Sequence, residues 1–341
     1  MIIKSAYYGK GVLYKMKILV IGGAGYIGGH VVKELMKNGH KVSVFDNFQT
    51  GLRQNLFPEN EFIYGSILNP TDLDSAFEKG FDAFIHMAAL KAAGESMLKP
   101  EEYAVHNLTG SINILNSALK HNCKMMVFSS TAAIFGEPKY LPIDEEHPKN
   151  PENFYGFTKL ELEKILTWYS KIKGLKFAAL RYFNAAGYDV DGELYGLEQN
   201  PANLLPVIME TAVGKRKGMK IFGDDYDTPD GTCIRDYVHV TDLARAHAKA
   251  LDYISKHDEN LKLNLGSEIG ISVKEMVEAA RRITGKPIPA EVVERRPGDP
   301  SNLYATSKLA HEKLNWYAEY SDIDSLISTT WNAYKRNFNV R

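Results

Sequence analysis

The sequence predicts an α/β fold: a doubly wound parallel sheet with a second, smaller lobe. Three observations predict it. Short β-branched runs alternate with helix-like segments, a glycine-rich turn joins the first run to the first helix, and the alternation weakens after about residue 185. We therefore expect an N-terminal extension at 1–15, a nucleotide-binding domain at 16–185 and a smaller lobe at 186–341. Segments near 236–266 are expected to return to the first domain.

The elements follow from hydrophobic periodicity and from helix-ending glycines. Strands are expected at 17–21, 41–46, 62–65, 82–89, 124–130 and 177–184. Helices are expected at 28–39, 71–80, 101–121 and 155–173. The segment 236–251 is expected to be mainly helical, with a strand at 261–266, and residues 1–15 contain no motif that indicates a function.

Composition excludes several classes of protein. The 41 basic and 42 acidic side chains nearly cancel, so no general attraction to nucleic acid or to an anionic membrane is expected. The two cysteines, Cys123 and Cys233, are too few for a disulfide framework, and no metal-binding spacing occurs. Without a signal peptide or a membrane-length apolar run, we expect a cytoplasmic protein.

The turn after the first expected strand carries Gly22, Gly25 and Gly28. Glycines at this spacing allow a tight turn, and they let backbone N–H groups at a helix N-terminus approach a pyrophosphate. Asp46 ends the next expected strand, where a carboxylate binds the adenosine ribose hydroxyls and repels a 2′-phosphate. The sequence therefore predicts NAD rather than NADP, although Asp46 serving only as a turn cap is the alternative.

Tyr155 and Lys159 stand four residues apart on an expected helix, so they share one face. The ammonium is expected to lower the pKa of the phenol from about 10, so that tyrosine can act as a base. Ser129, Ser130 and Thr131 close the expected strand at 124–130, where a hydroxyl can polarise an alcohol or a carbonyl. Tyr155, Lys159 and a hydroxyl from this strand end are the predicted catalytic group.

Together these elements resemble the extended short-chain dehydrogenase/reductase family, over nearly all of residues 16–335. Several segments are more specifically similar to the UDP-glucose 4-epimerases of that family: GGAGYIGGH (22–30), DNF (46–48), HMAALKAAGES (86–96), FSSTAAIFGEP (128–138), YGFTK (155–159), RYFNAAG (181–187), GDDYDTPDGTCIRDYVHVTDLA (223–244) and RRPGD (295–299). The resemblance implies a Rossmann-like domain that binds NAD, a lobe that binds a UDP-sugar, and a homodimer formed through the helices at 101–121 and 155–173.

Site residues carry over at matching positions. The resemblance implies that Tyr155 is the base, with Lys159 and Thr131 as its partners, and that Lys91 lies near the nicotinamide ribose. It implies NAD contacts from Gly22, Gly25, Tyr26, Ile27, Gly28, Asp46, Asn47, Ser66, Ile67, Ala88, Lys91, Asn107, Tyr155, Lys159 and Tyr182, with Asn107 at a phosphate or nearby backbone. It implies substrate contacts from Lys91, Thr131, Tyr155, Asn184, Asn203, Leu204, Phe222, Arg235, Arg296, Asp299 and Leu303. Two arginines suit a diphosphate, and Asp299 suits the uridine ribose.

Two positions depart from the family pattern. Ser66 stands where the family usually has an aspartate that contacts the adenine amino group, which leaves the affinity for NAD open. Leu303 stands where side-chain bulk influences whether the pocket admits an N-acetyl group. Leucine is of intermediate size, so the sequence does not settle whether N-acetylated sugars are accepted.

The expected function is the interconversion of UDP-glucose and UDP-galactose through a 4-keto intermediate, with transient reduction of tightly bound NAD. A 4,6-dehydratase needs Asp-Glu after the strand-end threonine, and Ala132-Ala133 argue against it. The remaining alternatives are an NAD-dependent epimerase or decarboxylase acting on UDP-N-acetylglucosamine or UDP-glucuronate, or a non-catalytic NAD-binding scaffold.

Overall fold

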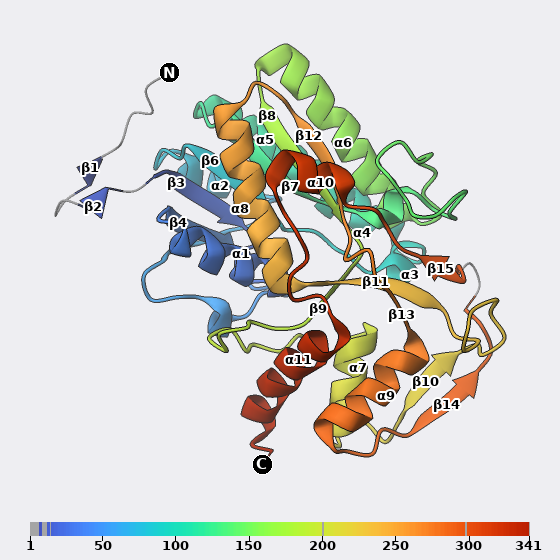
Figure 1. Cartoon of the computed structure of the whole chain (residues 1–341). Helices are drawn as coiled ribbons and strands as arrows, with labels where there is room; N and C mark the ends of the chain where they lie inside the picture. The colour runs from blue at the N-terminus through green and yellow to red at the C-terminus, as the bar shows by residue number, and fades with distance from the viewer. Residues whose placement is uncertain (1–6, 9–11, 14, 200, 297–298, 341) are drawn as a thin grey trace. The chain divides into compact units, whose positions relative to one another are not determined.

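The computed structural model describes residues 7–8, 12–13, 15–199, 201–296 and 299–340 (Figure 1). The chain divides into two compact units. The first comprises Met1–Gly136, Pro151–Arg181 and Ala244–Lys262; the second comprises Glu137–Asn150, Tyr182–Leu243 and Leu263–Arg341. The domain boundary predicted at residue 185 stays a prediction. Most of the predicted extension at 1–15 lies outside the described residues, apart from the short antiparallel strands β1 (Tyr7–Tyr8) and β2 (Val12–Leu13).

The first unit is built on a seven-stranded sheet with the order β12-β8-β7-β6-β3-β4-β5. Its strands are β3 (Lys17–Ile21), β4 (Lys41–Asp46), β5 (Glu61–Tyr64), β6 (Ala83–His86), β7 (Met125–Thr131), β8 (Lys176–Tyr182) and β12 (Leu261–Leu265). The pairs from β5 through β3 to β7 are parallel. All seven expected strands are present, which confirms the predicted doubly wound α/β fold.

The helices of the first unit follow the predicted positions: α1 (Tyr26–Lys37), α2 (Pro70–Phe77), α5 (Gly110–Lys120) and α6 (Phe154–Lys173). The expected helix at 101–121 is a composite, in which α4 (Pro100–Tyr103) passes through the π-helical turn η2 (Ala104–Thr109) into α5. A short helix α3 (Ala93–Ser96) precedes it, η1 (Arg53–Asn55) follows β4, and α8 (Val240–Lys256) contributes residues from Ala244 onward.

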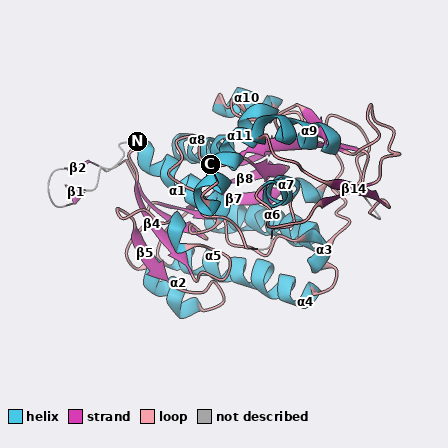
Figure 2. Cartoon of the chain, turned by 90° about the horizontal axis from the view of Figure 1, so that it is seen from below, coloured by secondary structure: helices cyan, strands magenta, loops and turns pink. Residues whose placement is uncertain are grey.

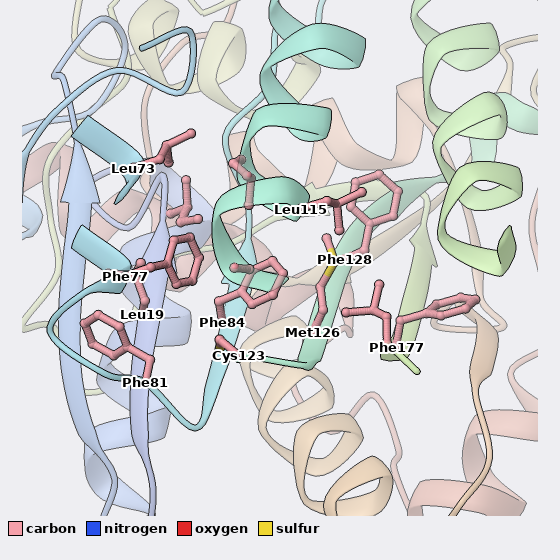
Figure 3. Packing of buried hydrophobic residues seen from close by; sticks show 14 of the residues in the cluster. Leu19, Leu73, Phe77, Phe81, Phe84, Leu115, Cys123, Met126, Phe128 and Phe177 are labelled. Carbon is pink, nitrogen blue, oxygen red and sulfur yellow. The ribbon is translucent and has the colours of Figure 1, made fainter. Parts of the chain in front are cut away.

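Apolar side chains from alternate strand positions form the core under α2, α5 and α6 (Figure 3). Leu19, Phe84 and Phe128 come from neighbouring strands, while Phe77 and Leu115 come from helices. Figure 2 shows α2 and α5 on one side of strands β4 and β5, with α1 on the other. Because both faces of the sheet are covered, the sequences of its strands are almost continuously apolar. Polar residues therefore lie at the carboxyl ends of the strands.

The second unit centres on β11 (Ile234–His239), which pairs with β9 (Asn184–Ala186) and β15 (Asn302–Leu303) in parallel and with β13 (Gly270–Ser272) antiparallel. A separate parallel pair joins β10 (Met219–Phe222) to β14 (Ala290–Val293). Helices α7 (Leu204–Ala212), α9 (Val273–Thr284) and α11 (Ile323–Phe338) share one apolar cluster, and α10 (Lys308–Leu314) follows β15. A capping box between Ser272 and Glu275 starts α9.

Candidate active site

The glycine-rich turn is shaped by a close approach of two backbone segments. Gly22 has φ +84°, and a Cβ placed there would lie 2.7 Å from the backbone nitrogen of Ala88. A Cβ on Gly28 would lie 2.2 Å from the Gly22 oxygen. The helix α1 begins at Tyr26, and its N-cap Gly25 supplies no side-chain hydrogen bond. The first N–H groups of α1 are therefore not capped by a side chain of their own N-cap, as an anion-binding helix N-terminus requires.

Asp46 lies at the carboxyl end of β4 beside this turn. One carboxylate oxygen accepts the N–H of Ala24 at 3.1 Å, and the other accepts the N–H of Phe48 at 2.8 Å. Burial raises the pKa of Asp46, and these backbone hydrogen bonds oppose that rise. Asp46 thus acts as the turn cap that the sequence offered as the alternative; its contact with a ribose stays a prediction, because the two roles are compatible.

The other residues predicted near the cofactor lie on the loops that follow the strands. Asn47 follows β4, Ser66 and Ile67 follow β5, and Ala88 follows β6. The Ser66 N–H donates to the Asp72 carboxylate at 2.9 Å. Sequence reasoning did not single out Asp72, and its only signal was its place in the first turn of the capped helix α2.

Asn107 lies in the π-helical turn and holds the loop that carries Lys91. Its amide donates to the Leu90 oxygen at 3.1 Å and its oxygen accepts the Leu90 N–H at 2.9 Å. The amide also donates to the Thr158 hydroxyl at 3.1 Å. Asn107 thus contacts nearby backbone, and its expected place beside a cofactor phosphate stays a prediction. A π-helical turn is rare and is often found at functional sites, because it displaces one side chain from the helical register.

Tyr155, Lys159 and Thr131 come together in the first unit, as the sequence predicts. The buried Lys159 ammonium donates to the Ser129 oxygen at 2.8 Å and lies 6.0 Å from the centre of the Tyr155 ring. The Tyr155 phenol hydrogen-bonds to the Thr131 hydroxyl, and Thr131 is the last residue of β7. The Asn153 side chain caps the start of α6 through the Gly156 N–H, which fixes where the helix begins.

The two ionisable groups of this cluster have strongly shifted pKa values. Burial lowers the pKa of Lys159 to about 7. Burial raises the pKa of Tyr155 to about 12, although the Thr131 hydrogen bond lowers it in part. The expected lowering of the tyrosine pKa by Lys159 is therefore wrong for this arrangement, because loss of solvation is the largest cause and raises this pKa.

Two buried residues that sequence reasoning missed support this cluster. The Ser96 hydroxyl accepts the N–H of Tyr155 at 3.0 Å. The Tyr103 hydroxyl accepts the N–H of Ala92 at 3.0 Å and donates to the oxygen of the same residue at 2.8 Å. Ser96 ends the segment HMAALKAAGES, in which no role was predicted for Ser96, and Tyr103 lies in no quoted segment.

The second unit gathers several residues predicted to bind the substrate. Arg235 on β11 is paired with Leu303 on β15, and the Arg235 guanidinium donates to the Asp299 carboxylate. The Arg296 guanidinium lies 3.8 Å from the centre of the Phe222 ring. The segment RRPGD is described at all but Pro297 and Gly298. The Arg235–Asp299 contact was not expected, since the sequence assigned the two residues to different parts of the nucleotide.

The remaining predicted substrate residues lie at the edges of elements. Asn184 begins β9 and its amide donates to the Asp236 oxygen at 3.1 Å. Asn203 is the N-cap of α7, and Leu204 is its first residue. Tyr182, which was predicted to contact NAD, is buried at the end of β8. Within the ranges that the structure describes, no group of His, Cys, Asp or Glu side chains could hold a metal ion.

Comparison with known proteins decides the family. Residues 18–266 match the model of the NAD dependent epimerase/dehydratase family. The chain belongs to this family. The UDP-glucose 4-epimerase of Halalkalibacterium halodurans is 44% identical over 324 residues, which cover 94% of this chain and 96% of that protein.

Solved structures agree with this family assignment. The UDP-glucose 4-epimerase of Brucella ovis in complex with NAD superposes with a TM-score of 0.91 at 42% identity, covering 93% of this chain and 98% of that one. The enzyme of Bifidobacterium longum, in complex with NAD⁺ and UDP, has a TM-score of 0.89 at 38% identity, covering 95% and 99%.

The NAD dependent epimerase/dehydratase family requires a dinucleotide site, and the first unit fits one. The evidence is the tight glycine turn, in which a Cβ on Gly22 or Gly28 would meet backbone atoms, together with the start of α1, whose N-cap supplies no side chain. In this member of the family the same sheet edge also carries Thr131 and the loop of Lys91. The residues present therefore suit NAD.

Proposed function

We propose that this member of the family interconverts UDP-glucose and UDP-galactose by epimerisation at C4 of the sugar. The observation that carries the proposal is the buried group of Tyr155, Thr131 and Lys159 at the end of the first unit's sheet, where the Lys159 ammonium lies 6.0 Å from the centre of the Tyr155 ring. Relatives that are 38–45% identical over at least 93% of this chain are named UDP-glucose 4-epimerases, which supports the substrate.

Each predicted site residue has a role that follows from its position in the fold. Gly22, Gly25 and Gly28 would hold the pyrophosphate of NAD, and Asp46 its adenosine ribose. When bound, NAD⁺ supplies the hydride acceptor for C4 and a positive charge near the phenol. Tyr155 removes the proton from the C4 hydroxyl while Thr131 holds the oxygen, and it returns the proton after the 4-keto sugar has presented its other face.

Lys159 and the nucleotide-binding residues set the conditions for this proton transfer. Lys159, held by the Ser129 oxygen, would bind the nicotinamide ribose and hold the cofactor beside Tyr155. Arg235 and Arg296 would bind the diphosphate and Asp299 the uridine ribose, so that binding energy falls on the nucleotide and the sugar stays free to rotate. In the second unit the Arg235–Asp299 contact keeps both side chains ordered.

The direct test incubates the purified protein with NAD and UDP-galactose. We expect UDP-glucose to accumulate to an equilibrium mixture without net formation of NADH, as product analysis by NMR would show. Parallel reactions with UDP-N-acetylgalactosamine and UDP-glucuronate test the alternatives, and the first of these decides what Leu303 admits. Unchanged UDP-galactose would contradict the proposed function, and carbon dioxide released from UDP-glucuronate would indicate a decarboxylase.

We also propose that the protein acts as a homodimer. Large apolar side chains are exposed on the helices that carry the site: Trp168 and Ile172, one turn apart on α6, are 61% and 66% exposed, and Val105 in η2 is 47% exposed. Exposed apolar residues on one helix face are typical of an interface between protein chains.

Trp168→Glu is expected to convert the dimer into a monomer, because it would place a charge in an apolar contact. Sedimentation velocity measures the change. Ile269→Glu is the matched control, since Ile269 is 53% exposed in the second unit and should leave the dimer intact. A dimer that survives Trp168→Glu would contradict the assigned interface.

Within the described part of the chain, no helix is long and apolar enough to cross a bilayer. Cys123 and Cys233 are both buried and unlinked. We infer a role in cytoplasmic galactose metabolism, and growth on galactose of a bacterial strain without its own epimerase would test it.

A further inference from the structure

A buried ion pair lies one helical turn beyond Lys159. Glu163 on α6 receives two hydrogen bonds from Arg181 on β8, one from Nε to Oε1 at 2.9 Å and one from Nη2 to Oε2 at 2.7 Å. The Ser130 hydroxyl donates to Glu163 Oε1 at 2.6 Å. The two charged side chains are each 2% exposed, and Ser130 is fully buried. The Arg181 guanidinium also lies 5.6 Å from the centre of the Phe135 ring.

Stability alone does not account for this pair. Removing two charges from water costs several kcal/mol for each ion, and well-packed apolar residues of similar volume often serve a fold equally well. Most of the surrounding core consists of apolar side chains. A paired charge at this place is therefore better explained by the exact geometry that it imposes on the segments that it joins.

The segments joined by the pair are the ones that carry the catalytic group. Tyr155, Lys159 and Glu163 follow one another at four-residue spacing on α6, so they lie along one face of the helix. Ser130 stands between Ser129, whose oxygen accepts from Lys159, and Thr131, whose hydroxyl meets Tyr155. The Ser130–Glu163 hydrogen bond thus fixes the end of β7 along the axis of α6.

We propose that Glu163, held by Arg181 and acting through Ser130, is a positioning residue for Tyr155, Lys159 and Thr131. It touches neither substrate nor cofactor. Its carboxylate sets the register between the catalytic helix and the end of the catalytic strand. A displacement of about 1 Å at a reacting group can cost about 10²-fold in rate, so this register matters to turnover.

Ser130→Ala tests the proposal with both charges left in place. The kinetic measurement rests on the proposed function, because it uses UDP-galactose as the substrate. We expect kcat for UDP-galactose to fall by about 10- to 100-fold, with KM and NAD content nearly unchanged. Ser117→Ala is the matched control: Ser117 is also buried and also donates to a carboxylate, Asp74, at 2.5 Å, but it lies on α5, away from the catalytic group. Its kcat should stay within about twofold.

The double variant Glu163→Met/Arg181→Met separates position from stability. Removing both charges leaves no unpaired ion, so the protein should remain folded in a thermal melt. We expect the kcat of the double variant to fall as far as that of Ser130→Ala. Adding Ser130→Ala to the double variant should lower kcat no further, because both changes remove the same Ser130–Glu163 hydrogen bond. A folded variant of either kind with unchanged kcat would overturn the proposal. If the double variant does not fold, Ser130→Ala decides.

A readout without turnover keeps this inference distinct from the proposed function. Phenolate absorbance of the chain, minus that of Tyr155→Phe, follows the ionisation of Tyr155 alone. In Ser130→Ala the pKa of Tyr155 should move down from about 12 toward its ordinary value, because a looser register admits water and reduces the desolvation that raises this pKa. Three other titratable groups interact with these residues: His86 on β6 with Lys159, Tyr103 on α4 with Tyr155, and Lys262 on β12 with Glu163 and Arg181. An unmoved titration would count against the proposal even if the unaltered chain did not convert UDP-galactose.

Discussion

Tyr155→Phe is expected to lower the conversion of UDP-galactose by about 10³- to 10⁴-fold, because it removes the only proton carrier assigned to the C4 oxygen. Among the contacts described, the Tyr155 hydroxyl interacts with Thr131. The backbone N–H of Tyr155 donates to the Ser96 hydroxyl, and the variant keeps this hydrogen bond. The fold and the bound NAD should therefore persist. Turnover at saturating UDP-galactose, with the NAD content of the purified protein, measures both expectations.

Tyr169→Phe is the control for this variant. Tyr169 lies on the same helix, and its hydroxyl donates to the Asn116 oxygen at 2.9 Å at an exposed position. Loss of that bond should change turnover by less than about twofold. If Tyr155→Phe kept a tenth or more of the activity, another group would have to be the base.

Arg235→Met is expected to raise KM for UDP-galactose by about 10²-fold and to leave kcat within a few-fold. The reason is that Arg235 is assigned to the diphosphate, which does not react, so its charge contributes nearly equally to the ground state and the transition state. The variant also leaves Asp299 without its guanidinium partner, which adds to the loss of affinity for the nucleotide. Initial rates over a range of UDP-galactose, and binding of UDP by calorimetry, separate the two constants.

Arg282→Met controls for the loss of an arginine. Its ion pair with Asp324 is exposed on both sides, and such pairs contribute about 0–1 kcal/mol to stability. We expect no change in KM. An Arg235→Met protein with unaltered UDP affinity would remove Arg235 from the nucleotide site.

The sheet was predictable because its strands are covered on both faces. The run KILVI is apolar after its first residue, the run KVSVFD is interrupted only by the small, buried Ser43, and the strands end where the runs end. The glycine turn and the Tyr155–Lys159 spacing were predictable for a related reason, since each is a local pattern with a fixed geometric purpose. These local patterns also led to the correct family.

The parts that sequence reasoning missed depend on distant contacts. Tyr103 ends α4 just before a π-helical turn that leaves no periodic signature, and Glu163 resembles any other polar helix residue until its contact with Arg181 is known. The predicted shift in the pKa of Tyr155 has the wrong direction, because residue spacing reveals a neighbouring charge but not how deeply the phenol is buried. The contact between Arg235 and Asp299 joins residues far apart in the chain, and one sequence gives no indication of it.

Asp46 has a consequence for any attempt to redesign the protein. The carboxylate proposed to choose NAD over NADP also receives the N–H groups of Ala24 and Phe48, and a Cβ on Gly51 would lie 2.8 Å from one of its oxygens. Exchanging Asp46 for a smaller or basic residue would loosen the glycine turn together with the ribose contact. Cofactor preference in this protein is therefore not an independent engineering variable, and a switch to NADP would require the loop at 47–51 to be rebuilt in the same step.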